Sequence, residues 1–201
     1  RAIENGEFQL YYQPKVDFVS GRICGVEALV RWQPPGEEMI SPGSFIPVAE
    51  ESGIIVAIGR WVLRAACMQA VAWQAQGLPP IRVAVNISAR QFGDVELLQD
   101  VERVLAESGL DPELLELEIT EGMLIHDTGR AIAVMTAIKK LGVRLAIDDF
   151  GTGYSSLAYL KRLPLDTLKI DRSFITGLPG DLNDAAIARA VIAMAHRLGL
   201  K

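Results

Sequence analysis

The sequence contains few of the residues that crosslink a protein or bind nucleic acid. Only two of its 201 residues are cysteine, and Lys and Arg number 20 against 25 Asp and Glu. The formal charge of −5 and the lack of any basic run argue against a nucleic acid polymer as partner, because non-specific binding needs clustered Lys and Arg. Cys24 and Cys67 lie in apolar patterns without paired spacing, so we expect buried free thiols in a reducing compartment.

Long hydrophobic runs are also missing. No secretory signal opens the chain and no uninterrupted apolar run approaches about 18 residues, so we expect no membrane contact from this segment. Half of the residues are hydrophobic, enough for one sizeable core, and no linker marks a second domain within 1–201. The chain starts at Arg1 without Met, which favours a domain excised from a cytoplasmic protein, or from the cytoplasmic part of a membrane-anchored sensor.

Short β-rich runs alternate with helical patterns along the chain. Glycines close several of the predicted helices, and each pair of later strands is separated by the length of one strand–helix–strand unit. Such alternation with right-handed crossovers gives an α/β fold, either a doubly wound sheet or a closed barrel. We predict strands at 8–18, 22–32, 81–88, 114–120, 143–149 and 166–172, and helices near 44–51, 59–76, 94–108, 128–141, 155–162 and 183–199.

Apolar side chains alternate with small or charged ones in five of the predicted strands. Because successive side chains point to opposite faces of a strand, each strand has one apolar and one polar face. A solvated face of an antiparallel sheet would explain one such strand. The intervening helices instead imply parallel strands, which are covered on both faces, so the polar faces converge on a shared interior. Charged groups gather toward the C-terminal strand ends, where α/β barrels carry their active sites, and we therefore favour the barrel.

Seven polar residues are expected at the mouth of that barrel. Their carboxylates and one Asn carbonyl form a hard-oxygen set that suits Mg²⁺, Mn²⁺ or Ca²⁺ rather than Zn²⁺. Without cations, so many buried carboxylates would repel one another and take up protons. Two adjacent acids at one strand end point different ways and suit two metals about 3.5–4 Å apart. The set is Glu27, Asn86, Glu118, Asp148, Asp149, Lys169 and Asp171.

Lys169 precedes Asp171 by two residues on the same predicted face. Two roles stay open for it. It is a counter-ion to the carboxylates or, if desolvation and nearby metals lower its pKa, a catalytic group that accepts or orients a proton of the attacking water. The glycine-containing segment after the fifth strand has the wrong spacing for a nucleotide fingerprint and is interpreted as a lid or coupling loop.

Six short motifs occur in order and cover essentially the whole chain. They are Y-Y-Q-P-K at 11–15, E-A-L-V-R-W at 27–32, N-I-S at 86–88, L-E-I-T-E at 117–121, D-D-F-G-T-G-Y-S-S-L at 148–157 and L-K-I-D at 168–171. Together they strongly resemble EAL domains, the phosphodiesterases that hydrolyse the bacterial second messenger cyclic di-GMP. The resemblance implies a TIM-like (β/α)₈ barrel with one antiparallel strand, which fits a strand at 8–18 joined directly to one at 22–32.

The resemblance also implies which residues bind metal. Glu27, Asn86, Glu118 and Asp148 would ligate a first ion, and Asp148 and Asp149 would reach a second. Mg²⁺ or Mn²⁺ would be the cofactor, and Ca²⁺ would inhibit.

The same resemblance implies further roles. Lys169 and Asp171 would hold or activate the bridging water, which attacks phosphorus in line and releases the linear dinucleotide. Glu27, as a metal ligand, belongs to this catalytic set. Gln13 and Arg31 would hold cyclic di-GMP. Glu121 would anchor the loop after the fifth strand and couple it to a homodimer interface.

The chain departs from the family at its C-terminus. Family members continue with a seventh strand ending in E-G-V-E and an eighth near Q-G, which supply a further glutamate to the second metal and a substrate-contacting glutamine. This sequence ends at H-R-L-G-L-K, so we expect a truncated domain without strands seven and eight, and an activity that depends on residues beyond Lys201. The sequence leaves open whether a sensor or cyclase domain is fused to it.

Two other functions compete with the phosphodiesterase. A non-catalytic cyclic di-GMP receptor of the same fold would lack metal ligands, but none is missing within 1–201. A barrel that abstracts a proton beside a metal-bound carboxylate fits the acids at successive strand ends, but not the N-I-S strand or the loop after D-D-F-G.

Overall fold

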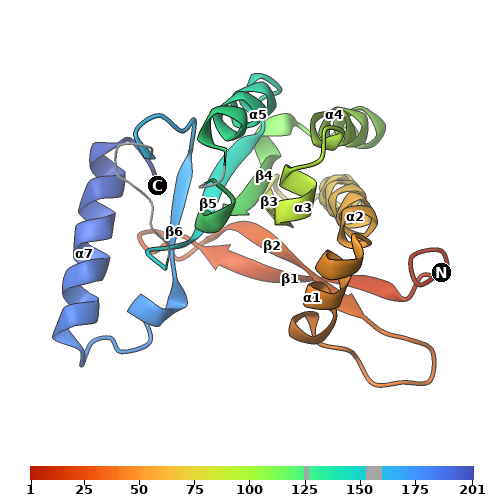
Figure 1. Cartoon of the computed structure of the whole chain (residues 1–201), viewed down its shortest axis with the longest axis horizontal. Coiled ribbons are helices and arrows are strands. Elements are labelled where there is room, and N and C mark those ends of the chain that lie inside the picture. The colour runs from red at the N-terminus through yellow and green to blue at the C-terminus, as the bar shows by residue number, and fades with distance from the viewer. Residues whose placement is uncertain (125–126, 153–159) are drawn as a thin grey trace. The chain divides into compact units, whose positions relative to one another are not determined.

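The structure, a computed structural model, describes residues 1–124, 127–152 and 160–201 (Figure 1). The chain forms two compact units, Arg1–Leu117 and Glu118–Lys201. The strands are β1 Phe8–Val16, β2 Ile23–Trp32, β3 Arg82–Ile87, β4 Leu115–Thr120, β5 Arg144–Phe150 and β6 Thr167–Ile170. The helices are α1 Pro42–Ser52, α2 Ile55–Ala75, α3 Ala89–Phe92, α4 Leu97–Ser108, α5 Thr128–Lys140 and α7 Leu182–Arg197, with short 3₁₀ turns η1 Pro112–Leu114, η2 Glu121–Leu124 and η3 Arg172–Phe174.

The first unit begins with an antiparallel hairpin. β1 pairs with β2 so that Gln13 lies opposite Glu27, and the connection between them is too short for any other direction. The longer helical connection after β2 makes β2 and β3 parallel, with Glu27 opposite Ala84. β4 lies next to β3 in the sheet and begins within this unit. The polar faces of β1, β2 and β3, which carry Gln13, Glu27 and Asn86, therefore lie side by side.

Helix α2 covers the first unit and belongs to its core. Its buried side chains recur at helical spacing, as at Ile58, Val62 and Ala66, and the helix contacts β1, β2, β3 and the helices α1, α3 and α4 (Figure 1). By length and composition, α2 is the one helix in the described ranges that would pass for a membrane span. Core helices of soluble proteins pass the same test, and the buried stripe of α2 is typical of one.

Aromatic side chains fill the space between α1, α2 and the hairpin. The ring of Phe8 lies 5.8 to 6.0 Å from those of Trp32, Phe45 and Trp61. These separations are typical of favourable tilted and edge-to-face ring pairs, which add to the burial of large apolar surfaces. The outward face of the hairpin is thereby fixed, so its other face carries Gln13 and Glu27.

The second unit continues the sheet with parallel strands. β4 ends in this unit, β5 lies next to it, and β6 pairs parallel with β5, with Ile147 opposite Leu168. Helix α5 covers β5 through Met135 and Ile138, which are fully buried. The Nζ of Lys139 pairs with Asp166 Oδ2 at 2.7 Å, and this carboxylate also accepts the N–H of Leu145 at 2.8 Å.

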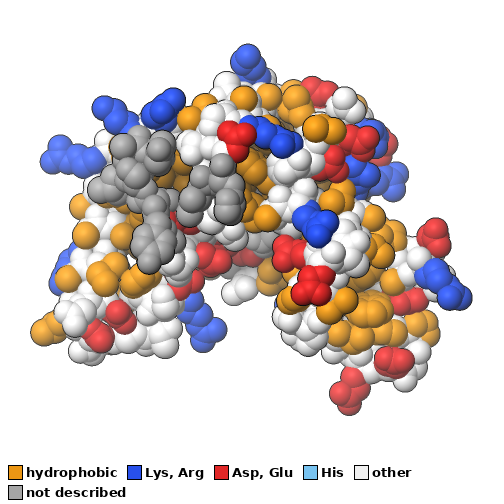
Figure 2. Space-filling model, viewed as in Figure 1, with side chains coloured by type: hydrophobic (Ala, Val, Ile, Leu, Met, Phe, Trp, Pro, Cys, Tyr) orange, Lys and Arg blue, Asp and Glu red, His pale blue; other side chains and the backbone are white. Residues whose placement is uncertain are grey.

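The last residues of the chain lie against the edge of β6. Lys201 N–H donates to Asp166 O at 3.0 Å, and Leu168 N–H donates to Lys201 O at 2.9 Å. This alternation is that of a parallel ladder. Helix α7 contacts β6, and its Ile187 and Ile192 are 40% and 45% exposed. Figure 2 shows hydrophobic side chains, drawn orange, on the surface over this helix.

The structure confirms the α/β fold with six strands and an antiparallel first pair, each strand within two residues of its predicted ends. The closed barrel stays a prediction. The predicted helix near 94–108 corresponds to α4, which begins at Leu97, and the short helix α3 before it was not predicted. Ser88 and Gln91 form a capping box that begins α3. The predicted helix at 155–162 falls largely on 153–159, outside the described residues.

Both cysteines are free, as predicted, but only one is buried. Burial raises the pKa of the Cys67 thiol to about 12, so this thiol stays protonated inside α2. The prediction that Cys24 is buried is wrong, because the residue lies at the open beginning of β2, next to the hairpin turn.

Candidate metal and phosphodiester site

In the first unit the structure brings Glu27 and Asn86 together. Parallel pairing sets Glu27 opposite Ala84, so Asn86 comes two residues later on the same face. The Nδ2 of Asn86 donates to Glu27 Oε1 at 2.8 Å. This bond fixes the amide so that its carbonyl oxygen is the remaining polar atom that a cation can use.

Two predicted substrate residues lie on the same face of the hairpin. Gln13 is exposed and opposite Glu27 in the β1–β2 register. Arg31 donates from Nη1 to Val30 O at 2.8 Å, and its guanidinium lies 5.5 Å above the ring of Tyr11. A guanidinium held over an aromatic ring keeps its charge and several donors for an anion. Tyr11 was missed in the sequence, although its alternation with Gln13 on β1 places both residues on one face.

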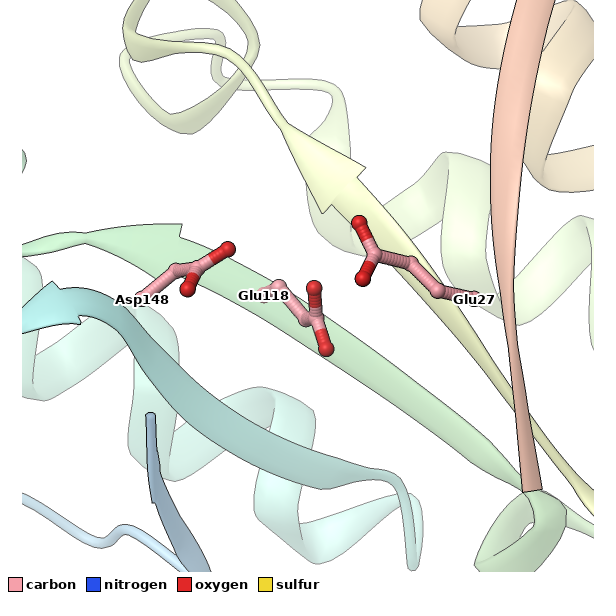
Figure 3. Close-up of side chains that lie close together, drawn as sticks. All are labelled: Glu27, Glu118 and Asp148. Carbon is pink, nitrogen blue, oxygen red and sulfur yellow. The ribbon is translucent and has the colours of Figure 1, made fainter. Parts of the chain in front are cut away.

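In the second unit the structure brings Glu118, Asp148 and Lys169 together. Lys169 Nζ donates to Glu118 Oε2 at 2.6 Å and to Asp148 Oδ2 at 2.7 Å. Glu118 is 1% exposed, so its charge depends on this cation. Figure 3 shows that Glu118 and Asp148 direct their carboxyl groups from neighbouring strands into the same space.

The pKa of Lys169 bears on its two predicted roles, counter-ion and catalytic group. Burial alone would lower the pKa of Lys169, but the ion pairs with Glu118 and Asp148 outweigh burial and raise the pKa above its usual value. The same burial that penalises the ammonium also strengthens its attraction to two carboxylates. The expected lowering of the pKa, which depends also on nearby metals, stays a prediction.

Asp149 and Asp171 form a second acidic pair. Burial first, and then the neighbouring Asp148 and Asp171, raise the pKa of Asp149, while a hydrogen bond joins Asp149 to Asp171. Hydrogen bonds from Ser173 lower the pKa of Asp171. Asp149 also has a φ of +53°, in the left-handed region where Asp is tolerated but most residues are strained.

Glu121 lies 2% exposed at the start of η2. Its Oε2 accepts the N–H of Gly151 at 2.9 Å, so a buried carboxylate holds the segment directly after β5. The part of the predicted coupling loop at 153–157 lies outside the described residues.

The side chains of the two units offer carboxylate and amide oxygens, the kind of ligand that a hard divalent cation prefers. Such ions prefer carboxylate and carbonyl oxygens, and Lys169 already supplies one positive charge to the second cluster, which is that of Glu118, Asp148 and Lys169.

Ser173 was missed in the sequence, although its position two residues after Asp171 is typical of an Asp side chain that accepts a local backbone N–H.

Comparison with known proteins identifies close relatives. The family described as EAL domain matches residues 1–201. The chain is 46% identical over 201 residues to the bifunctional diguanylate cyclase/cyclic di-GMP phosphodiesterase MucR of Pseudomonas aeruginosa, and 44% identical over 201 residues to the cyclic di-GMP phosphodiesterase NbdA of the same organism. All of the chain is matched, but it covers only 29% and 26% of those proteins.

Solved structures also resemble the chain over its full length. The PaMucR phosphodiesterase in complex with c-di-GMP has a TM-score of 0.95 and 46% identity, and the match covers 100% of this chain and 81% of that one. The strand order and the antiparallel first pair of this chain are thus those of a structure solved with the cyclic dinucleotide bound.

Proposed function

We propose, since the chain belongs to the EAL domain family of cyclic di-GMP phosphodiesterases, that it hydrolyses cyclic di-GMP to the linear dinucleotide. The observation that carries the proposal is the cluster of Glu118, Asp148 and Lys169, with two carboxylates within 2.7 Å of one ammonium. Such a concentration of charge at strand ends is more typical of a reaction centre than of a structural core.

We propose that the acids and the amide hold two divalent ions, Mg²⁺ or Mn²⁺, with Ca²⁺ as an inhibitor. Glu27, Asn86, Glu118 and Asp148 would hold the first, and Asp148 and Asp149 would reach the second. The oxygen-only donor set supports this choice of ion. When bound, such ions polarise a phosphoryl oxygen and lower the pKa of water.

The residues of the chain would then divide the remaining tasks. Arg31 and Gln13 bind the dinucleotide, because a guanidinium suits the non-bridging oxygens of a phosphate. Lys169 donates a hydrogen bond to the attacking water rather than accepting its proton, in keeping with its raised pKa. Asp171, kept ionised by Ser173, accepts a hydrogen bond from that water. The water oxygen bonds to phosphorus as the bond to the ribose 3′ oxygen breaks, and the proton that the water loses ends on that 3′ oxygen.

The test is hydrolysis of cyclic di-GMP by the full-length protein with Mg²⁺ or Mn²⁺, with the linear product measured by chromatography. Glu27→Ala removes a metal ligand and should lower the rate by at least about 100-fold while leaving the fold intact. The matched control is Glu37→Ala, at an exposed glutamate outside the site, which should retain the wild-type rate. Intact metal binding without turnover would reject the phosphodiesterase, and cyclic di-GMP binding without turnover would select the receptor of the same fold.

Further proposals rest on the same family membership. We propose that the whole protein completes an eight-stranded barrel, which the pairing of Lys201 with the edge of β6 supports, and that 1–201 is the larger part of one EAL domain. A homodimer, a cytoplasmic location and fused sensor or cyclase domains are proposed as well. The small share of the curated relatives that this chain covers supports the additional domains.

A further inference from the structure

The single-turn helix η3 begins at a fixed acidic group. The backbone N–H of Ser173 donates to Asp171 Oδ1 at 2.8 Å, and its hydroxyl donates to the same oxygen. Two donors on one oxygen hold the Asp171 carboxylate in a single orientation. Asp171 in turn is hydrogen-bonded to the carboxyl group of Asp149. Ser173 therefore reaches the predicted second metal ligand through one intermediate.

The other end of η3 touches the same strand end by packing. A side chain at residue 151 would begin 2.7 Å from Phe174 Cε2, so the ring lies directly against Gly151, whose φ is +104°. The N–H of Gly151 is held by the buried carboxylate of Glu121. The backbone that leaves Asp149 is thus fixed by a ring and a buried carboxylate.

We propose that Ser173 and Phe174 are positioning residues for hydrolysis, which act through Asp171 and Asp149. The inference rests on the proposed phosphodiesterase activity and adds two residues that the metal and substrate sets do not contain. Groups that orient metal ligands change metal affinity or activity by about 10–100-fold when they are lost. Asp149 has a left-handed backbone, so the direction of its side chain depends on the residues that hold this strand end.

The first arm of the test compares Ser173→Ala, Ser173→Thr and Thr176→Ala in the full-length protein. We expect Ser173→Ala to lower kcat about 10-fold with KM nearly unchanged, and Ser173→Thr to restore most of the rate because it keeps both donors. Thr176→Ala is the matched control, since its hydroxyl donates to Arg172 O at 2.9 Å in the same turn without touching Asp171. Equal losses in Ser173→Ala and Thr176→Ala, with no rescue by Thr, would overturn the proposal.

The second arm measures Mn²⁺ affinity by calorimetry, which does not depend on turnover. Ser173→Ala and Phe174→Leu should each bind Mn²⁺ about 10-fold more weakly than wild type, while Thr176→Ala binds it normally. Phe174→Leu keeps an apolar side chain, so we expect the variant to fold. Circular dichroism and Tm check this. If wild type binds Mn²⁺ but releases no product, the phosphodiesterase proposal is rejected, and the Mn²⁺ affinities of the variants still decide the positioning role. Unchanged affinity in both variants, or no Mn²⁺ binding by wild type, overturns the positioning role.

Discussion

The two units hold their site residues in different ways. In Arg1–Leu117, Glu27 and Asn86 are joined by one amide–carboxylate hydrogen bond and stay partly or fully exposed. In Glu118–Lys201, Glu118 is almost fully buried and shares a lysine with Asp148. A hydrogen bond between accessible groups contributes little net stability, whereas a buried charge that loses its partner costs several kcal/mol. We therefore expect a change in the first pair to cost little stability, and a change in the second cluster to cost several kcal/mol.

The largest effect should come from removing the cation of the second cluster. Lys169→Met keeps most of the apolar stem of the side chain but leaves Glu118 buried without its ammonium, which should destabilise the protein by about 3–5 kcal/mol in urea unfolding. The matched control is Arg64→Met, which breaks an exposed ion pair with Glu107 and should cost about 0–1 kcal/mol. Similar losses in the two variants would remove the distinction between the units.

The pH dependence of stability should show the same lysine titrating. Because the folded-state pKa of Lys169 is raised above its unfolded value, its contribution is complete below the unfolded pKa of about 10.4 and is lost as pH rises through the folded pKa. Wild type should therefore lose stability in the alkaline range more steeply than Lys169→Met. Parallel curves of unfolding free energy against pH for the two proteins would contradict the raised pKa.

The smallest effect is expected in the first unit. Asn86→Ala removes one hydrogen bond to Glu27 between accessible groups and should change the free energy of unfolding by about 0.5–1.5 kcal/mol at most. The same variant should weaken Mn²⁺ binding clearly, because it also removes the oxygen that we propose as a metal ligand. A stability loss as large as that of Lys169→Met would mean that the first pair is structural.

The faces of the site residues could be predicted from the sequence, but their charge states could not. Alternation with period two was enough to place Glu118 and Asp148 on one side of neighbouring strands, because the buried face of each strand fixes the other. Whether the side chain of Lys169 is protonated depends on the balance between its burial and two ion pairs at 2.6 and 2.7 Å. No pattern of residues gives that balance.

Two other features were not predicted, and only one of them had a signal in the sequence. The S-x-x-Q spacing of Ser88 and Gln91 is a known capping box and would have predicted α3 as a separate turn. The contact of Phe174 with Gly151 had none, because it joins a 3₁₀ turn to the end of another strand and results only from tertiary packing.

The hairpin of β1 and β2 also bears on the order in which the chain assembles. Gln13 and Glu27 lie opposite each other across a turn of a few residues, whereas Lys169 meets Glu118 across 51 residues of sequence. Local contacts form faster than distant ones, since less chain entropy is lost in closing the loop. Synthesis also makes the hairpin first. We therefore expect the hairpin, with the proposed substrate residues Gln13 and Arg31, to form during synthesis before Lys169 can meet Glu118 and Asp148.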